Sequence, residues 1–239
     1  MMLKPYYETE LGKLYHGDCL QIMPELEPVD LVLTDPPYEG LIGGFKFKDK
    51  GVVKMKNQSF SVGDVWSADP NWYSVLPKTK GIIRFTTHSG MESCLKHQPG
   101  KLILIGVWHK PNTSPGAPST PHYSCEFFIG TYLETGLLWR NLKDFIIETQ
   151  DFGGCISRGE RIRNKDGSNA HPTQKPVNVI RPLIMNGANI IIDPFLGSGT
   201  TAIACERLKR RWIGIEIEEK YCEIAAKRIE AERKQLKLF

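Results

Sequence analysis

The sequence predicts an α/β fold, with a mostly parallel sheet and helices on both of its faces. Short apolar runs of strand length alternate along the chain with stretches in which apolar residues recur at helical spacing. One of these runs, at 189–192, leads through a glycine-rich turn into a helical stretch, as in nucleotide-binding units. A chain of 239 residues with this pattern is expected to form a single domain over residues 1–239.

The individual elements follow from the same two periodicities. Helices are expected at 200–208 and from about 218 to beyond 233, where apolar residues follow i, i+3, i+4 spacing. Three polar or proline- and glycine-containing segments are expected to be irregular, at 38–66, 111–121 and 153–172. The expected strands lie at 29–34, 81–86, 102–108, 127–132, 145–149, 189–192 and 212–215.

Composition excludes several classes of protein. The hydrophobic fraction of 41% and charged fraction of 24% are typical of soluble globular proteins. No segment resembles a signal peptide or reaches the roughly 18 apolar residues of a membrane span, so a cytoplasmic protein without a membrane partner is expected. The six cysteines form no CxxC pair and none has zinc-ligand spacing from a histidine cluster. We therefore expect buried thiols and no metal.

The net charge of +4 is compatible with a polyanionic partner, and two of the expected irregular segments carry clusters of basic residues. We interpret both segments as basic loops, the alternative being solvated loops with no specific role. The first contains Lys46, Lys48, Lys50, Lys54 and Lys56, and the second contains Arg158, Arg161, Arg163 and Lys165.

The glycine-rich turn is the most informative motif. The run from Ile190 to Asp193 is followed by Pro-Phe-Leu-Gly-Ser-Gly-Thr-Thr-Ala, so Gly197, Gly199 and Ala202 match GxGxxG/A spacing. Glycines let the backbone approach a ligand closely, and the following helix start favours an anionic group. Glu216, at the end of the next strand, is placed to accept hydrogen bonds from both ribose hydroxyls of a nucleotide-like ligand. The alternative is a tight turn without a ligand.

A second motif, Asp35-Pro36-Pro37-Tyr38, follows the run VDLVLT. The prolines have no amide donors, Asp35 offers a carboxylate acceptor, and Tyr38 offers an aromatic face. Such a site suits an NH2 group attached to a planar ring. A proline turn after a strand remains the alternative.

Two further motifs allow a functional and a structural interpretation. In His-Pro-Thr173-Gln-Lys175-Pro176, Thr173 and Lys175 suit the carboxylate of an amino-acid-like ligand, whereas a helix start with a Thr173 cap is the structural alternative. Asp18 follows a strand-like piece and would lie at the ligand-binding edge of a sheet. Its structural alternative is the cap of a short helix through Met23.

Together these motifs resemble the β group of amino-methylating DNA methyltransferases, in which a DPPY-type motif precedes the FxGxG motif. Here Asp35 begins DPPY and Phe195 begins FLGSG, with HPTQKP before the latter and GIEI after it. The segment from Trp108 to Asn112 and Glu126 also resemble the middle region of that group. The resemblance implies a Rossmann-like S-adenosylmethionine-dependent methyltransferase fold with a circularly permuted motif order.

The resemblance also implies a role for each matching residue. Glu216 would hold the ribose of S-adenosylmethionine, Asp18 would lie at its adenine end, and Thr173 and Lys175 would contact its methionine part. The catalytic pocket would consist of Asp35, Pro36, Pro37 and Tyr38. The remaining cofactor contacts would come from Asp193, Phe195, Gly197, Gly199 and Thr200.

The implied partner is double-stranded DNA, from which the target base is flipped onto Tyr38. DNA contacts would come from 39–66 and 151–170. Lys46 and Lys48 would mainly contact phosphates, and one or more of Arg158, Arg161 and Arg163 would read base edges. DPPY favours N6 of adenine, while N4 of cytosine and a non-catalytic DNA-binding relative remain alternatives. A homodimer and a cognate restriction endonuclease are left open as partners.

Overall fold

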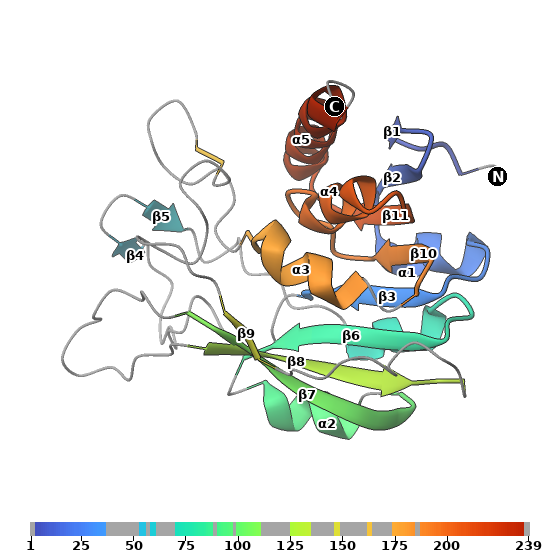
Figure 1. Ribbon diagram of the computed structural model, residues 1–239, viewed down its shortest axis with the longest axis vertical. Coiled ribbons are helices and arrows are strands. Elements are labelled where there is room, and N and C mark those ends of the chain that lie inside the picture. Colours follow the sequence, from blue (N-terminus) through green and yellow to red (C-terminus); the bar gives the residue numbers. More distant parts are fainter. Residues whose placement is uncertain are drawn as a thin grey trace.

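The centre of the computed structural model is a nine-stranded sheet in the order β1-β2-β11-β10-β3-β6-β8-β7-β9 (Figure 1). The strands β2, β11, β10, β3 and β6 run parallel to one another, β1 and β8 are antiparallel to their neighbours, and β9 pairs with β7 in parallel. The structure describes residues 3–36, 53–55, 58–60, 70–87, 90–97, 99–110, 125–134, 146–148, 162–163, 174–184 and 187–236. The predicted mostly parallel sheet is confirmed.

The strands agree with the expected apolar runs to within a few residues at each end. The short β1–β2 hairpin was expected only in part, because β1 is two residues long and carries no apolar run. The strand bounds are β1 Tyr7–Glu8, β2 Gly12–His16, β3 Leu31–Thr34, β6 Gly81–Thr86, β7 Lys101–His109, β8 Cys125–Tyr132, β9 Ile146–Glu148, β10 Ile190–Asp193 and β11 Arg211–Glu216.

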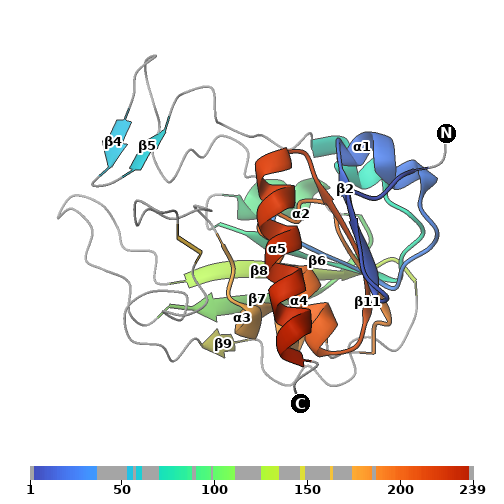
Figure 2. The ribbon, with the colours of Figure 1, turned by 90° about the horizontal axis from the view of Figure 1, so that it is seen from above.

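The expectation that all of 38–66 is irregular is wrong for part of it. Within that segment β4 (Val53–Met55) and β5 (Gln58–Phe60) pair as a separate antiparallel hairpin. The segment has no long apolar run, and a hairpin that short gives only a weak signal in sequence. Both views of the ribbon place this hairpin away from the central sheet, on the side to which β6 and β10 point (Figures 1 and 2).

Helices cover both faces of the sheet, as the sequence predicts. On one face α3 (Val177–Ile184), α4 (Thr200–Arg207) and α5 (Glu219–Leu236) lie side by side (Figure 2). On the other, α1 (Cys19–Ile22) and the 3-10 turns η1 (Met23–Glu25) and η3 (Pro70–Val75) pack over Ile192 and Ile215. The helix α2 (Met91–His97) follows β6 and was not expected. No described helix is long and apolar enough to cross a bilayer.

Alternation along the strands explains the two cores. In β3, Leu31 and Leu33 pack with the α3–α5 side, while Val32 between them packs with the α1 side. In the same way Ile191 and Ile192 of β10 belong to opposite cores. Strands covered on both faces carry nearly continuous apolar runs, and this is why they could be located from sequence.

The strand order reverses between β3 and β10. The strands β10 and β3 are neighbours in the sheet. After β10 the chain continues through α4 to β11, on the side of β10 away from β3. After β3 the next strand added to the sheet is β6, on the side of β3 away from β10. Ligands of open α/β sheets bind outside the carboxyl ends of the strands at such a point. Asp35 and the glycine-rich turn follow these two strands directly, so the fold places them at the same edge.

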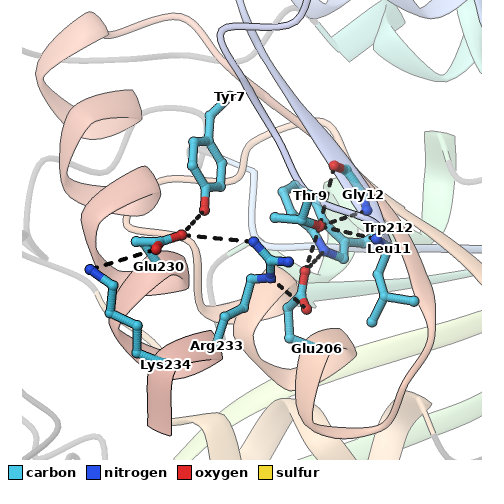
Figure 3. A network of polar contacts seen from close by, with 9 residues as sticks. All are labelled: Tyr7, Thr9, Leu11, Gly12, Glu206, Trp212, Glu230, Arg233 and Lys234. Carbon is cyan, nitrogen blue, oxygen red and sulfur yellow. Dashed lines mark hydrogen bonds and ion pairs between the residues drawn. The ribbon is translucent and has the colours of Figure 1, made fainter. Parts of the chain in front are cut away.

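A buried glutamate ties the N-terminal hairpin to the helical face (Figure 3). Glu206 of α4 accepts hydrogen bonds from Thr9 Oγ1 at 2.7 Å and from Trp212 Nε1 at 2.9 Å. Arg233 of α5 lies 3.8 Å from its second oxygen. Tyr7 donates a hydrogen bond to Glu230 at 2.9 Å and so adds a second link between β1 and α5.

Because Glu206 is buried, its removal would leave buried donors without acceptors. We expect Glu206→Ala to lower the free energy of unfolding by about 3 kcal/mol, since each unsatisfied buried partner costs roughly 1–3 kcal/mol. Urea titration measures this. The matched control is Glu223→Ala, which removes an exposed i, i+4 pair with Lys227 and should cost under about 0.5 kcal/mol. Equal losses of unfolding free energy in the two variants would show that the buried network stabilises the fold no more than an exposed ion pair does.

Candidate active site

Asp193 joins the strand ends at the switch point. It is the last residue of β10, and its carboxylate accepts hydrogen bonds from Thr34 Oγ1 at 2.8 Å, Thr201 Oγ1 at 2.6 Å and the Phe195 amide at 3.1 Å. Burial raises the pKa of Asp193 to about 6, against the opposing effect of these three donors. At neutral pH the carboxylate is therefore mainly ionised, and it fixes the ends of β3 and β10 and the start of α4 relative to one another.

The turn between β10 and α4 requires glycine at two positions. Gly197 and Gly199 have φ of 55° and 87°, in the left-handed region. A Cβ at Gly199 would also lie 3.0 Å from the Cβ of Ala225 in α5. Arg228 of α5 stabilises the turn by donating a 2.5 Å hydrogen bond to the Ser198 carbonyl. The turn is thus held between the sheet and α5, with α4 starting directly behind it.

Glu216 lies at the carboxyl end of β11, beside this turn. Its two oxygens accept hydrogen bonds from the amides of Gly197 at 2.8 Å and Glu218 at 2.9 Å, and the residue is 8% exposed. Burial raises the pKa of Glu216 above its ordinary value. A carboxylate has about four acceptor positions, so two backbone donors leave capacity for ligand hydroxyls.

A series of charged side chains, each in contact with the next, ends at Asp35. The ammonium of Lys175, just before α3, contacts the Asp35 carboxylate and lies 3.2 Å from Glu126 Oε2 of β8. Glu126 in turn contacts Lys110, which follows β7. The backbone carbonyl of Lys175 accepts a 3.0 Å hydrogen bond from Thr200 Oγ1, at the start of α4. Lys175 therefore links the residue after β3 to the glycine-rich turn.

The described part of the predicted site gathers at one edge of the sheet. The Gly17 amide donates to the Glu216 carbonyl at 3.0 Å, which places Asp18 beside the end of β11. Asp18 itself caps α1 by accepting from the Leu20 amide at 2.9 Å, as its structural interpretation predicts. The predicted residues brought to this edge are Asp18, Asp35, Pro36, Lys175, Asp193, Phe195, Gly197, Gly199, Thr200 and Glu216.

Several predicted residues lie outside the described residues. They are Pro37, Tyr38, Lys46, Lys48, Lys50, Lys56, Arg158, Arg161, Lys165 and Thr173. Lys54 belongs to β4, and Arg163 is described and exposed. The amide of Ile162 donates to the Gln174 side chain at 3.2 Å, so Arg163 lies close to the segment that carries Lys175. Within the described part, no group of three or more His, Cys, Asp or Glu side chains could hold a metal ion.

Sequence reasoning assigned no role to three residues near this edge. Glu126 and Lys110 stand at the ends of adjacent antiparallel strands, where Glu126 pairs in register with Trp108. Opposite charges at the facing ends of two apolar runs are the signal that could have indicated this pair. Trp72 of η3 meets Phe195 edge to face, with ring centroids 5.6 Å apart. Its segment has no clear periodicity, so this contact could not be inferred from sequence.

Comparisons with known proteins identify the family of the chain. The family model N6_N4_Mtase, described as DNA methylase, matches residues 46–227. The Type II methyltransferase M2.MboI of Moraxella bovis is 28% identical, with 95% of this chain and 92% of the relative covered. The Type II methyltransferase M2.DpnII of Streptococcus pneumoniae is 27% identical, with 97% and 94% covered.

Solved structures show the same fold. The chain is similar to M1.HpyAVI in its complex with SAM, with a TM-score of 0.61, 23% identity, and 91% of this chain and 100% of the other covered. It is also similar to the cytosine-N4-specific PvuII DNA methyltransferase, with a TM-score of 0.62, 15% identity, and 93% and 88% covered. The predicted Rossmann-like methyltransferase architecture is confirmed.

Proposed function

The chain belongs to the N6_N4_Mtase family of DNA methylases, and we propose that it transfers a methyl group from S-adenosylmethionine to N6 of adenine in double-stranded DNA. The observation that carries this proposal is the position of Asp35. Its carboxylate follows β3 at the switch point and is linked through Lys175 to the glycine-rich turn after β10. An acceptor for a target amino group thus lies next to a nucleotide-binding turn.

The residues at the turn fit S-adenosylmethionine. Glu216 is a buried carboxylate with acceptor capacity left, suited to two ribose hydroxyls. The left-handed glycines leave room for close backbone approach, and Asp18 lies beside the end of β11 for the adenine end. Phe195, Thr200, Lys175 and Thr173 remain the proposed contacts to the rest of the cofactor. The bound cofactor supplies an electrophilic methyl group on a sulfonium.

In this proposal the chain contributes positioning and electrostatics. Asp35 and the Pro36 carbonyl accept the two hydrogens of the target amino group, which weakens conjugation of the nitrogen lone pair with the ring. The amino nitrogen would take the methyl group in place of one of its protons, and that proton would leave toward the Asp35 carboxylate that already accepts it. Tyr38 stacks on the flipped base, a contact of roughly 1–3 kcal/mol.

We further propose that DNA is bound by the two basic segments, 39–66 and 151–170. Supporting this, Arg163 is exposed and lies near Gln174, next to the residue that contacts Asp35. The lysines, including Lys46 and Lys48, would neutralise phosphates. The arginines Arg158, Arg161 and Arg163 would read base edges, because a guanidinium binds guanine in a bidentate manner. A cognate restriction endonuclease would cleave the same, unmethylated site.

The base preference has a direct test. Incubation of the purified protein with labelled S-adenosylmethionine and duplex DNA should yield N6-methyladenine at a defined sequence, as nucleoside analysis and site mapping would show. The DPPY motif favours adenine over cytosine. A product that is only N4-methylcytosine would reverse the base assignment while leaving the enzyme class intact, and transfer only to RNA or protein would contradict the proposed function.

A further inference from the structure

Glu126 is placed to control the catalytic carboxylate without reaching the base itself. It is the second residue of β8, two strands away from β3, and its side chain is 22% exposed. One of its oxygens contacts Lys110, and the other lies 3.2 Å from the ammonium of Lys175, which contacts Asp35. The four charged groups therefore form one line, Lys110–Glu126–Lys175–Asp35.

The contact between Glu126 and Lys175 acts through charge. The Oε2 atom of Glu126 is buried, and the Lys175 ammonium lies 3.2 Å from it as its ion-pair partner. Burial raises the pKa of Glu126, but Lys175 and Lys110 outweigh burial and hold the pKa below its ordinary value. Burial likewise lowers the pKa of Lys175, and Asp35 and Glu126 reverse that effect. Both groups are therefore charged at neutral pH.

This geometry has a consequence for Asp35. A lysine paired with Asp35 alone would neutralise the carboxylate that the amino group needs as an acceptor. With Glu126 on its other side, the ammonium divides its charge between two carboxylates, and its position is fixed from both sides. Lys110 balances Glu126 from the side remote from Asp35, with its ammonium 4.4 Å from the ring centroid of Trp108.

We propose that Glu126 is a positioning residue for methyl transfer, holding Lys175 so that Asp35 is both oriented and electron-rich toward the target amino group. This inference rests on the proposed function, because it assigns Asp35 to the amino group. Glu126 touches neither base nor cofactor in this scheme. Its effect therefore passes through Lys175.

A matched ion pair lies at the opposite end of β3, the strand that Asp35 follows. Asp30, just before β3, contacts Lys80 Nζ at 2.5 Å and accepts hydrogen bonds from the amides of Asn189 and Ile190. Its side chain is 16% exposed, close to that of Glu126. Asp30→Asn therefore removes a comparable charge from the edge of the sheet that lies away from the site.

The experiment compares Glu126→Gln with Asp30→Asn, since glutamine keeps the shape of Glu126 and removes its charge. We expect kcat on DNA to fall about 10²-fold in Glu126→Gln, the size expected when a reacting group is misplaced by about 1 Å. The S-adenosylmethionine Kd, measured by calorimetry, should rise by a smaller factor than kcat falls, because Lys175 is also a proposed cofactor contact. In Asp30→Asn, kcat per folded molecule should stay within twofold of the wild type.

A double-mutant cycle tests whether Lys175 transmits the effect. In a Lys175→Gln background, adding Glu126→Gln should change kcat by less than about threefold, because the link is already broken. Additive losses would mean that Glu126 acts by another route. Urea unfolding of each variant gives the folded fraction, so a loss of stability is not counted as a loss of turnover.

Crystal structures of the protein without cofactor or DNA provide a readout that does not depend on activity. In Glu126→Gln the Lys175 ammonium should leave its place between the two carboxylates and the Asp35 side chain should turn. If the wild type methylates no DNA, the proposed function fails, and these structures still decide the inference. Side chains that superpose on the wild type would overturn it, as would wild-type kcat in Glu126→Gln or a loss confined to cofactor affinity.

Discussion

Replacing Asp35 with alanine should abolish methyl transfer and leave S-adenosylmethionine binding within a few-fold of the wild type. Asp35 follows β3 and its carboxylate contacts the ammonium of Lys175, whereas Glu216 binds the Gly197 amide of the glycine-rich turn. Loss of a preorganised group that stabilises developing charge costs about 10²–10³ in rate, and Asp35 is in addition the charged acceptor of the reacting amino group. We expect a loss at or beyond the upper end of that range.

Turnover and cofactor affinity must be measured separately, by single-turnover transfer to duplex DNA and by calorimetry. Asp35→Asn is the matched variant, because it keeps the side-chain volume and one carbonyl acceptor but loses the charge that faces Lys175. Its turnover should lie between those of wild type and Asp35→Ala. Turnover near that of the wild type in the alanine variant would exclude the proposed role of Asp35.

The central sheet could be predicted from sequence because its strands are buried on both faces. Runs such as Leu31–Leu33 of β3 and Ile190–Ile192 of β10 are continuously apolar, and both contribute to the two cores. The β4–β5 hairpin and α2 have no comparable pattern and were missed. The helix α3 was considered only as the structural alternative for HPTQKP, since Pro182 lies within it and interrupts its helical signal.

The candidate site could also be predicted from sequence only in part. Asp35 and Glu216 stand directly at strand ends, and Gly197 and Gly199 lie in the short turn after β10, so the positions of the strands determine the positions of these residues. The link from Asp35 through Lys175 to Glu126 joins residues 140 and 49 positions apart, and no local spacing relates them. Only the register of β7 and β8 beside β6 brings Glu126 to this edge.

Glu216→Ala should weaken S-adenosylmethionine binding by about 1.5–3 kcal/mol, or roughly 10- to 150-fold in Kd, because two ribose hydroxyls lose a charged acceptor. The same change removes the acceptor of the Gly197 amide and so loosens the turn itself. Calorimetry measures the affinity, and turnover at saturating cofactor should recover most of the wild-type rate. An unchanged Kd would refute the assignment of Glu216 to the ribose.

The pH dependence of cofactor binding gives a second test of the role of Glu216. Because burial raises the pKa of Glu216, its carboxylate is protonated at a higher pH than that of an exposed glutamate, so affinity should fall as the pH is lowered through the raised pKa. Asp193, with a pKa of about 6, titrates in the same turn. Glu216→Gln identifies the Glu216 contribution, because it keeps the side-chain size but cannot titrate. In that variant only the dependence due to Asp193 should remain, and an unaltered pH profile would assign the whole titration to Asp193.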